Sequence, residues 1–317
     1  MSEQASHTSG GVSGEAATSP VLSIVVSTIG RPDAMRRLLA SLVDQTDTKN
    51  FELIVVDQSE DQQSAAIVND ADLPFAAVTT TSARGACLGR NVGTGLARGG
   101  LLAFPDDNCQ YTPTAVAEVI ALMDRRPRVG ILSGLLVTAT GSPSMLRWPS
   151  QRTQITRTNV QQTAIEATMF IRRELFVAVG GFDESIGVGS PGPYQAGEAT
   201  DLILRALATG AEGEFDPSVH IIHEDFRAAV EENFPLKMRG YGRGLGHVYR
   251  TNRLPGREVA YYAGRKLAAS VVRTVRGRRD LGRADLAWAR GLVEGYLNSG
   301  KSHRALRSPS ELEYRGD

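Results

Sequence analysis

Residues 88–108, LGRNVGTGLARGGLLAFPDDN, decide the fold. The stretch opens with glycines at helical spacing, continues as a short apolar strand from Leu101 to Phe104, and ends at two carboxylates and an amide. Asp106, Asp107 and Asn108 offer the hard oxygen ligands that Mg²⁺ or Mn²⁺ prefers, and such ions usually take one or two protein carboxylates beside substrate phosphates and water. The same residues are also typical of a polar turn that closes a strand. The triplet alone leaves both interpretations open.

The residues upstream predict a parallel sheet. Residues 21–28, VLSIVVST, form a nearly continuous β-branched run, which indicates a strand covered on both faces. Apolar residues at helical spacing predict a helix over Asp33–Leu42, and a second strand is predicted over Phe51–Val56. Ligands of such βαβ units bind beyond the carboxyl ends of the strands. The polar residues expected together at that edge are Thr28, Asp57 and Asp106.

Further segments follow in a recognisable order: GGFDE at 180–184, GEATDLILRALATG at 197–210, and a histidine within 219–224. With the segments above, they make residues 20–250 resemble glycosyltransferase family 2. The resemblance implies an α/β fold of the GT-A type, with a Rossmann-like nucleotide-binding sheet, flanking helices and a helical C-terminal extension. It also implies metal-assisted sugar transfer, with inversion, from a nucleoside diphosphate donor to a glycan or lipid-linked acceptor.

Matching by position, the resemblance implies a role for each candidate residue. Thr28 and Arg31 would border the nucleotide, Asp57 would meet the base or ribose, and Arg90 would reach the nucleotide or diphosphate. Asp106, Asp107 and Asn108 would be the metal-binding triplet, with Asp106 facing the donor. His223, which matches better than His220, would complete the shell of Mn²⁺ or Mg²⁺. A lone histidine near a strand end is otherwise more often structural.

Two positions depart from the family pattern. Asn108 stands where the family has a third acid, and its neutral oxygen predicts weaker metal binding. Ala199 stands after Glu198, where the family commonly has the catalytic base. Both departures favour a rival interpretation, a catalytically weak partner subunit that still binds the sugar nucleotide. Nucleotidyl transfer, which would release pyrophosphate, is a second alternative.

The acids left in this motif are Glu198 and Asp201, three residues apart. At the start of a helix they share a face and also suit the helix dipole, which is the alternative role. Glu198 lies about 100° around a helix from Ala199 and Asp201 about 200°. We therefore predict that Glu198 accepts the acceptor proton and that Asp201 orients or caps the helix.

Composition bounds the remaining possibilities. The chain has 317 residues, 41% of them apolar, and balances 35 basic against 35 acidic residues, so no general attraction to nucleic acid follows. Two cysteines indicate neither a disulfide scaffold nor a zinc site. Arginine outnumbers lysine 31 to 4, which favours a GC-rich bacterial source and, by association, cell-envelope polysaccharide synthesis.

Three regions are expected along the chain. Residues 1–19 are predicted to be a disordered tail without a secretory signal. Residues 20–225 form the transferase domain, with a nucleotide-binding half at 20–110 and an acceptor half at 111–225, in which residues 139–163 are predicted as a loop. Residues 226–317 form a helical extension. With no membrane-spanning run, we expect a cytoplasmic protein, at most peripheral at the inner face of the membrane.

The C-terminal extension leaves two questions open. The glycine-rich Arg239–Arg250 suits either a lid over phosphate or a helix-packing turn. Seven basic residues between Arg265 and Arg283, beside an apolar stripe from Leu286 to Tyr296, predict peripheral contact of residues 265–297 with an anionic membrane. The alternative is that the stripe packs on the core and the charges are solvated.

Overall fold

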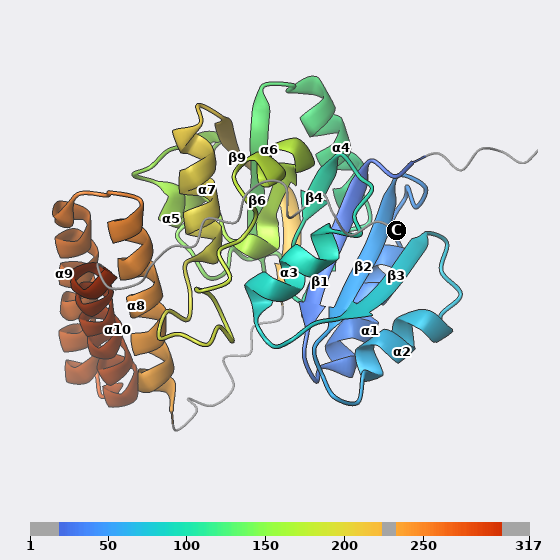
Figure 1. Ribbon diagram of the computed structural model, residues 1–317. Helices are drawn as coiled ribbons and strands as arrows, with labels where there is room; N and C mark the ends of the chain where they lie inside the picture. Colours follow the sequence, from blue (N-terminus) through green and yellow to red (C-terminus); the bar gives the residue numbers. More distant parts are fainter. Residues whose placement is uncertain (1–18, 224–232, 300–317) are drawn as a thin grey trace, which may run out of the picture.

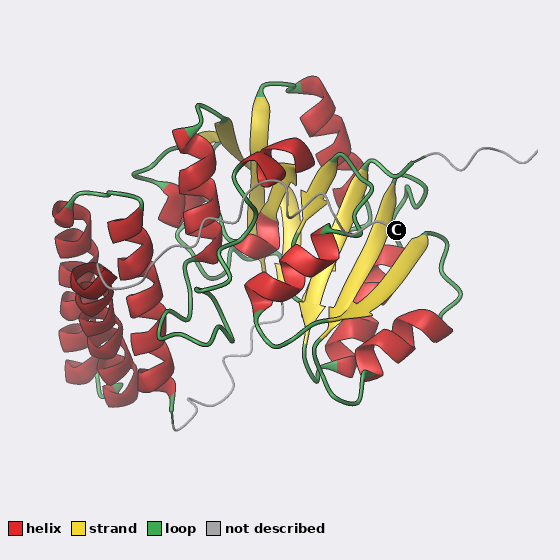
Figure 2. Ribbon diagram, viewed as in Figure 1, coloured by secondary structure: helices red, strands yellow, loops and turns green. Residues whose placement is uncertain are grey.

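The computed structural model describes residues 19–223 and 233–299. A mixed sheet with helices on both faces forms the body of the molecule, and three C-terminal helices stand together at one side of it (Figure 1). The same arrangement, with strands in yellow and helices in red, is seen in Figure 2. The fold is therefore the mixed α/β architecture with a helical C-terminal region that the sequence predicts.

Nine strands build the sheet. They are β1 Leu22–Thr28, β2 Phe51–Asp57, β3 Ala76–Thr81, β4 Leu101–Ala103, β5 Cys109–Tyr111, β6 Val129–Val137, β7 Thr153–Ile155, β8 Met169–Arg172 and β9 Glu212–His223. The helices are α1 Pro32–Val43, α2 Gln63–Asp70, α3 Ala86–Thr94, α4 Ala115–Arg125, α5 Val160–Thr163, the 3₁₀ turn η1 Glu166–Thr168, α6 Arg173–Ala178, α7 Glu198–Ala208, α8 Phe234–Thr251, α9 Gly256–Val275 and α10 Arg279–Asn298.

The strand order is β3-β2-β1-β4-β8-β6-β9-β5, with β7 paired to β9. Strands β3, β2, β1 and β4 are parallel, and the register sets Thr28 opposite Asp57 at the carboxyl ends of β1 and β2. Alternate side chains of β1 enter two hydrophobic cores, because successive residues of a strand point to opposite faces. Val25 joins one core and Ile24 the other. This explains the unbroken apolar run in the sequence.

Most predicted elements are confirmed within one or two residues. The structure has the predicted strands over residues 21–28 and 51–56 and the predicted helix over 33–42. The expectation of a loop over 139–163 is wrong in part, because β7 and α5 lie within it. The isolated polar sequence carries little periodicity, and β7 is stabilised by pairing with β9.

Glycines of residues 88–108 let α3 lie close to the sheet. A Cβ atom on Gly93 would come 2.5 Å from Cγ1 of Val25, and one on Gly89 would come 2.2 Å from Oγ of Ser27. Neither distance is possible without displacement, so only glycine permits this approach. The helix therefore holds Arg90 and Asn91 beside the ends of the parallel strands.

The glycine-rich segment Arg239–Arg250 lies inside α8, which favours helix packing over a lid, the two alternatives that the sequence left open. A Cβ atom on Gly246 would lie 2.0 Å from the backbone oxygen of Leu292 in α10, and one on Gly295 of α10 would lie 2.1 Å from that of Arg243. Small residues on both helices thus allow backbone contact.

The stripe predicted at 286–296 belongs to this bundle. Ala289 and Leu292 are buried in the core and Tyr296 donates a hydrogen bond to the carbonyl of Leu254 at 3.1 Å. The packed alternative is therefore the correct one for this stripe. None of the described helices is long and apolar enough to cross a membrane. Residues 1–18 of the tail predicted over 1–19, and the predicted domain boundary at 225/226, lie outside the described residues.

Gly246→Ala should lower the thermal stability of the chain, because its added methyl group meets the α10 backbone. We expect a loss of about 1–3 kcal/mol in the free energy of unfolding, as for other overpacked sites. The matched control is Gly264→Ala in α9, where a Cβ atom meets nothing within 4 Å. That change should be neutral or stabilise the helix by up to about 1 kcal/mol. Thermal unfolding of both variants decides, and a wild-type transition for Gly246→Ala would contradict the backbone contact.

Candidate active site

A cavity of about 500 Å³ opens at the carboxyl ends of the parallel strands. Its wall combines three regions: the strand ends and α3, the start of α7 with the preceding loops, and the C-terminal helices. The predicted site residues that line it are Thr28, Arg31, Arg90, Asp106, Asp107 and Glu198. The structure thus gathers six of the ten predicted residues around one space.

Arg90 is the most constrained of these residues. Its guanidinium group is buried, its Nη2 atom donates to Oδ1 of Asp106 at 3.0 Å, and its Nη1 atom lies 3.8 Å from Oε1 of Glu198. The Nε and Nη1 atoms have no hydrogen-bond partner. A buried charge with unpartnered donors is costly, so this arrangement calls for an anion in the cavity.

Asp107 is held by the first strand and the loop after it. Its Oδ2 atom accepts a hydrogen bond from Oγ1 of Thr28 at 2.7 Å, and its Oδ1 atom accepts one from Nη1 of Arg31 at 3.1 Å. Burial raises the pKa of Asp107 despite these two contacts, and the neighbouring Asp106 carboxylate adds to the rise. Thr28, Arg31 and Asp107 therefore form one preorganised corner of the cavity.

Glu198 begins α7, after Gly197, whose φ of 101° favours glycine. Burial raises the pKa of Glu198 to about 8, and the carboxylate of Glu166 contributes further. Glu166, which also lines the cavity, accepts a hydrogen bond from the backbone N–H of Ala199 at 2.9 Å. The sequence reasoning missed Glu166, because a single acid in a polar stretch carries no motif.

Four acidic and four basic side chains line the cavity: Asp106, Asp107, Glu166 and Glu198, and Arg31, Arg84, Arg90 and Lys237. Burial alone would lower the pKa of Arg90, yet the carboxylates of Asp106, Glu166 and Glu198 raise it. Burial and the same three carboxylates raise the pKa of Tyr241 to about 12. Both shifts show that three carboxylates lie close to Arg90 and Tyr241.

Four predicted residues do not line the cavity. The carboxylate of Asp57 is buried and accepts hydrogen bonds from the backbone N–H groups of Ser59 and Ala65, at 3.0 Å each, so it closes the loop after β2. Gln58, the next residue, does line the cavity.

Asn108 and His223 lie close together. Asn108 comes just before β5, and His223 is the last residue of β9, which pairs with β5. The Nδ2 atom of Asn108 is 3.0 Å from Nε2 of His223. Neither residue reaches the cavity wall, and the described residues contain no cluster of three or more His, Cys, Asp or Glu side chains that could hold a metal by themselves. The proximity of the pair was predicted, but it places no ligand beside Asp106.

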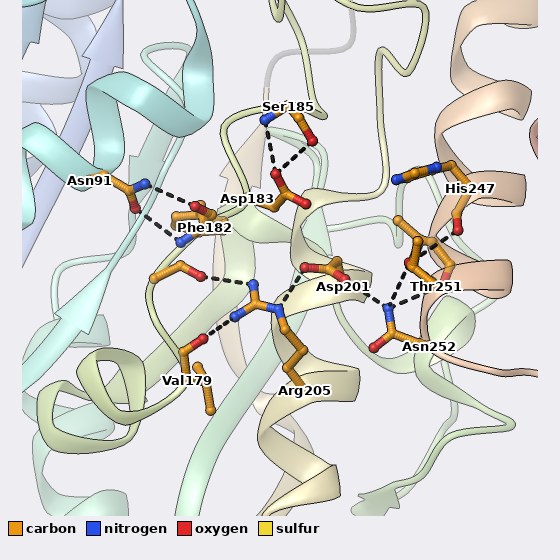
Figure 3. A network of polar contacts seen from close by, with 12 residues as sticks. Asn91, Val179, Phe182, Asp183, Ser185, Asp201, Arg205, His247, Thr251 and Asn252 are labelled. Carbon is orange, nitrogen blue, oxygen red and sulfur yellow. Dashed lines mark hydrogen bonds and ion pairs between the residues drawn. The ribbon is translucent and has the colours of Figure 1, made fainter. Parts of the chain in front are cut away.

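Asp201 anchors α7 to its neighbours (Figure 3). Its carboxylate accepts hydrogen bonds from Nε of Arg205 and from Nδ2 of Asn252 at the end of α8, each at 2.7 Å. Arg205 also donates to the carbonyls of Val179 and Gly181. Both charges are buried, so α7 is fixed to the loop before it and to the C-terminal helices.

The same network extends to the nucleotide-binding half. Asn91 of α3 donates through Nδ2 to the carbonyl of Phe182 at 2.9 Å and accepts through Oδ1 from its N–H at 3.0 Å (Figure 3). One residue of GGFDE is thereby held by the helix that carries Arg90. The contacts join GGFDE and GEATD to each other and to α3, and neither Asp183 nor Asp201 lines the cavity.

The C-terminal helices complete the wall. Tyr241 and Leu245 of α8 and Trp288 of α10 line the cavity on that side. Sequence reasoning missed all three, because apolar and aromatic residues in helices most often indicate core packing. The cavity thus has a charged half at the strand ends and a largely apolar and aromatic wall at the C-terminal helices.

Residues 23–180 match the family model described as glycosyl transferase family 2. An uncharacterised glycosyltransferase of Haemophilus influenzae is 29% identical over 112 residues, which are 35% of this chain and 37% of that protein. The O-antigen biosynthesis protein RfbC of Myxococcus xanthus is 25% identical over 267 residues, covering 72% of this chain and 19% of that protein. The chain therefore spans well under half the length of these curated relatives.

Solved structures share the fold. TarS 1-349 of S. aureus in complex with UDP-GlcNAc is 16% identical, with a TM-score of 0.53 over 84% of this chain and 90% of that one. The mannosyltransferase PcManGT of Pyrobaculum calidifontis, in complex with GDP-Man and Mn²⁺, is 14% identical, with a TM-score of 0.57 over 90% and 89%. These similarities establish the GT-A fold that the sequence predicts.

Asp201→Asn should destabilise the chain, because it leaves the buried Arg205 guanidinium without its carboxylate. Removing one partner of a buried pair typically costs about 3–5 kcal/mol. The control is Asp33→Asn, which breaks an exposed pair with Arg36 and should cost at most about 1 kcal/mol. Denaturant unfolding compares them, and equal losses would show that the Asp201 network does not stabilise the fold.

Proposed function

Because residues 23–180 place the chain in glycosyltransferase family 2, we propose that it transfers a sugar from a nucleoside diphosphate donor to an acceptor hydroxyl with inversion at the anomeric carbon. Structural neighbours in complex with UDP-GlcNAc and with GDP-Man support a donor of this class. The acceptor is proposed to be a glycan or a lipid-linked glycan, as the O-antigen relative indicates.

One observation carries the proposal: the buried Arg90 has two unpartnered donor atoms at an open cavity. A diphosphate supplies the anionic oxygens that those donors lack, and charge-assisted contacts to phosphate are strong. In transfer, negative charge grows on the departing nucleoside diphosphate. A preorganised guanidinium that stabilises this charge lowers the barrier more than it stabilises the bound donor.

The residues present also fit a divalent metal. Asp106 and Asp107 offer carboxylate oxygens at the same wall, and Mg²⁺ or Mn²⁺ needs only one or two protein carboxylates when phosphates are present. When bound, the ion neutralises charge on the diphosphate as a Lewis acid. His223 and Asn108 are not part of the proposed metal coordination shell, because neither residue lines the cavity.

Glu198 is the proposed general base, which takes the proton of the acceptor hydroxyl as its oxygen attacks the anomeric carbon. The raised pKa of Glu198, about 8, makes its ionised form a stronger proton acceptor than an ordinary carboxylate. Ala199, the next residue, stands where the family commonly has the catalytic base and has no side chain that could accept a proton. Asp201, held by Arg205 and Asn252, is a positioning residue for α7.

The C-terminal wall is the proposed acceptor side. Trp288, Tyr241 and Leu245 face the donor half across the cavity, and aromatic rings offer apolar faces for a sugar ring or a lipid-linked group. These residues lie outside the part of the chain that matches the family. We propose that they set acceptor preference, in a reaction on the cytoplasmic side of a bacterial envelope.

The experiment that tests the function is a donor panel. The purified chain is incubated with UDP- and GDP-sugars, Mn²⁺ or Mg²⁺, and glycan or lipid-linked acceptors. Acceptor-dependent release of nucleoside diphosphate, with a glycoside of inverted anomeric configuration, supports the proposal. Release of pyrophosphate would instead identify a nucleotidyltransferase. Donor binding without turnover under any condition would identify the catalytically weak binding subunit, which Ala199 and Asn108 favour.

Glu198→Gln should lower turnover by about 10²–10⁴, the usual contribution of a general base, with donor affinity retained. Because a base must be ionised, kcat/KM of the wild type should rise as the pH increases through about 8, and this limb should vanish in the variant. Asp106, Arg90 and Glu166 are the charged groups that face Glu198.

Glu166→Gln is the matched control for the base. Removing the Glu166 charge should move the pH limb of kcat/KM to lower pH, because that charge contributes to the raised pKa of Glu198. If Glu166→Gln removes the limb and Glu198→Gln keeps it, Glu166 is the base and the assignment is wrong.

A further inference from the structure

Helix α9 leaves an apolar face uncovered. It packs against α10, and its fully buried residues are Val259 and Ala263. Leu267, Val271 and Val275 recur at every fourth position, so they share one side of the helix, and they are 45%, 64% and 82% exposed. Single exposed apolar residues need no explanation, but a contiguous row of them marks an interaction surface.

Two neighbours widen this row. Tyr261 and Val272 are 53% and 48% exposed, and the small residues between them on the same side are Ala260, Gly264 and Ala268. We call Tyr261, Leu267, Val271, Val272 and Val275 the α9 face. In Figure 1, α9 stands at the outer edge of the C-terminal helices, on the side away from the sheet.

Basic residues border the α9 face. Arg265 lies beside Tyr261, with its guanidinium 5.5 Å from the ring centroid, and Arg276, Arg278 and Arg279 are exposed at the carboxyl end of the helix. Between residues 256 and 283 there are eight Lys or Arg residues against Glu258 and Asp280. The surface is therefore apolar along its centre and strongly positive at its border.

We infer that the α9 face binds the surface of a membrane that contains anionic lipid. Apolar side chains enter the region between headgroups and acyl chains while the arginines meet the headgroup phosphates, as in other interfacial helices. A second copy of the chain would bring two positive borders together and is disfavoured by charge. No described helix could span a bilayer, so the contact lies on the surface.

This surface differs from the stripe that the sequence pointed to. The residues of α10 from Leu286 to Tyr296 pack into the bundle, whereas the α9 face points to solvent. The docked helix also contacts the cavity wall, because Nζ of Lys266 lies 5.3 Å from the ring centroid of Trp288. If the proposed function holds, docking would set the acceptor side of the cavity near lipid-linked substrates.

Vesicle sedimentation tests the inference. The full chain is mixed with vesicles of phosphatidylcholine alone and with vesicles rich in phosphatidylglycerol. We expect binding to the anionic vesicles only, lost in Val271→Asp/Val275→Asp. The matched control, Val43→Asp/Val78→Asp, adds the same charges at two residues that are each 41% exposed in the nucleotide-binding half, and should bind as the wild type does. Circular dichroism confirms that each variant is folded.

A second pair of substitutions tests the positive border. Arg276→Gln/Arg279→Gln should weaken binding to anionic vesicles by roughly twenty-five-fold, or roughly fivefold for each lost charge. Sedimentation velocity of the wild type measures the oligomeric state and so tests whether a second copy of the chain covers the α9 face. A dimer that Val271→Asp/Val275→Asp dissociates, with no vesicle binding, would assign the face to a second copy and overturn the inference. Equal binding by the wild type and both valine double variants would overturn it as well.

Discussion

A buried positive charge that lacks enough partners constrains the rest of this structure. The Arg90 guanidinium meets Asp106 and approaches Glu198, yet two of its nitrogen atoms have no partner at an open cavity. Because desolvating an unpaired charge is costly, such a group persists where a bound anion repays the cost. The surrounding carboxylates raise the pKa of Arg90 and keep the guanidinium ionised, and we propose that a phosphate-bearing ligand supplies the contacts that it lacks.

The fold supplies that geometry through contacts far from the cavity. Glycines of α3 allow the helix to lie close to β1, and this close packing positions Arg90 beside the ends of the parallel strands. Asn91 ties α3 to Phe182. Arg205 ties the segment just before Phe182 to α7, and Asp201 ties α7 to the end of α8. Donor half, proposed base and C-terminal wall are thus parts of one connected framework (Figure 3).

Periodicity was enough to predict β1, β2, β4 and α1, since their apolar spacing reflects which faces are buried. The order of motifs was enough to predict that Thr28, Arg31, Arg90, Asp106, Asp107 and Glu198 belong to one site, and all six line the cavity. The order of motifs also placed Asp57 at this edge of the sheet, where its carboxylate accepts hydrogen bonds from backbone N–H groups of its own loop and does not line the cavity; its contact with the base or ribose stays a prediction. The order of motifs missed Glu166 and Trp288, because their place at the cavity depends on tertiary contacts that no local pattern records.

The most direct test of the central claim is a crystal structure of the chain with a nucleoside diphosphate and Mn²⁺. The account predicts phosphate oxygens within hydrogen-bond distance of Nε or Nη1 of Arg90, the two atoms that have no hydrogen-bond partner within the protein. A nucleotide bound elsewhere, with those two nitrogen atoms still unpartnered, would contradict it.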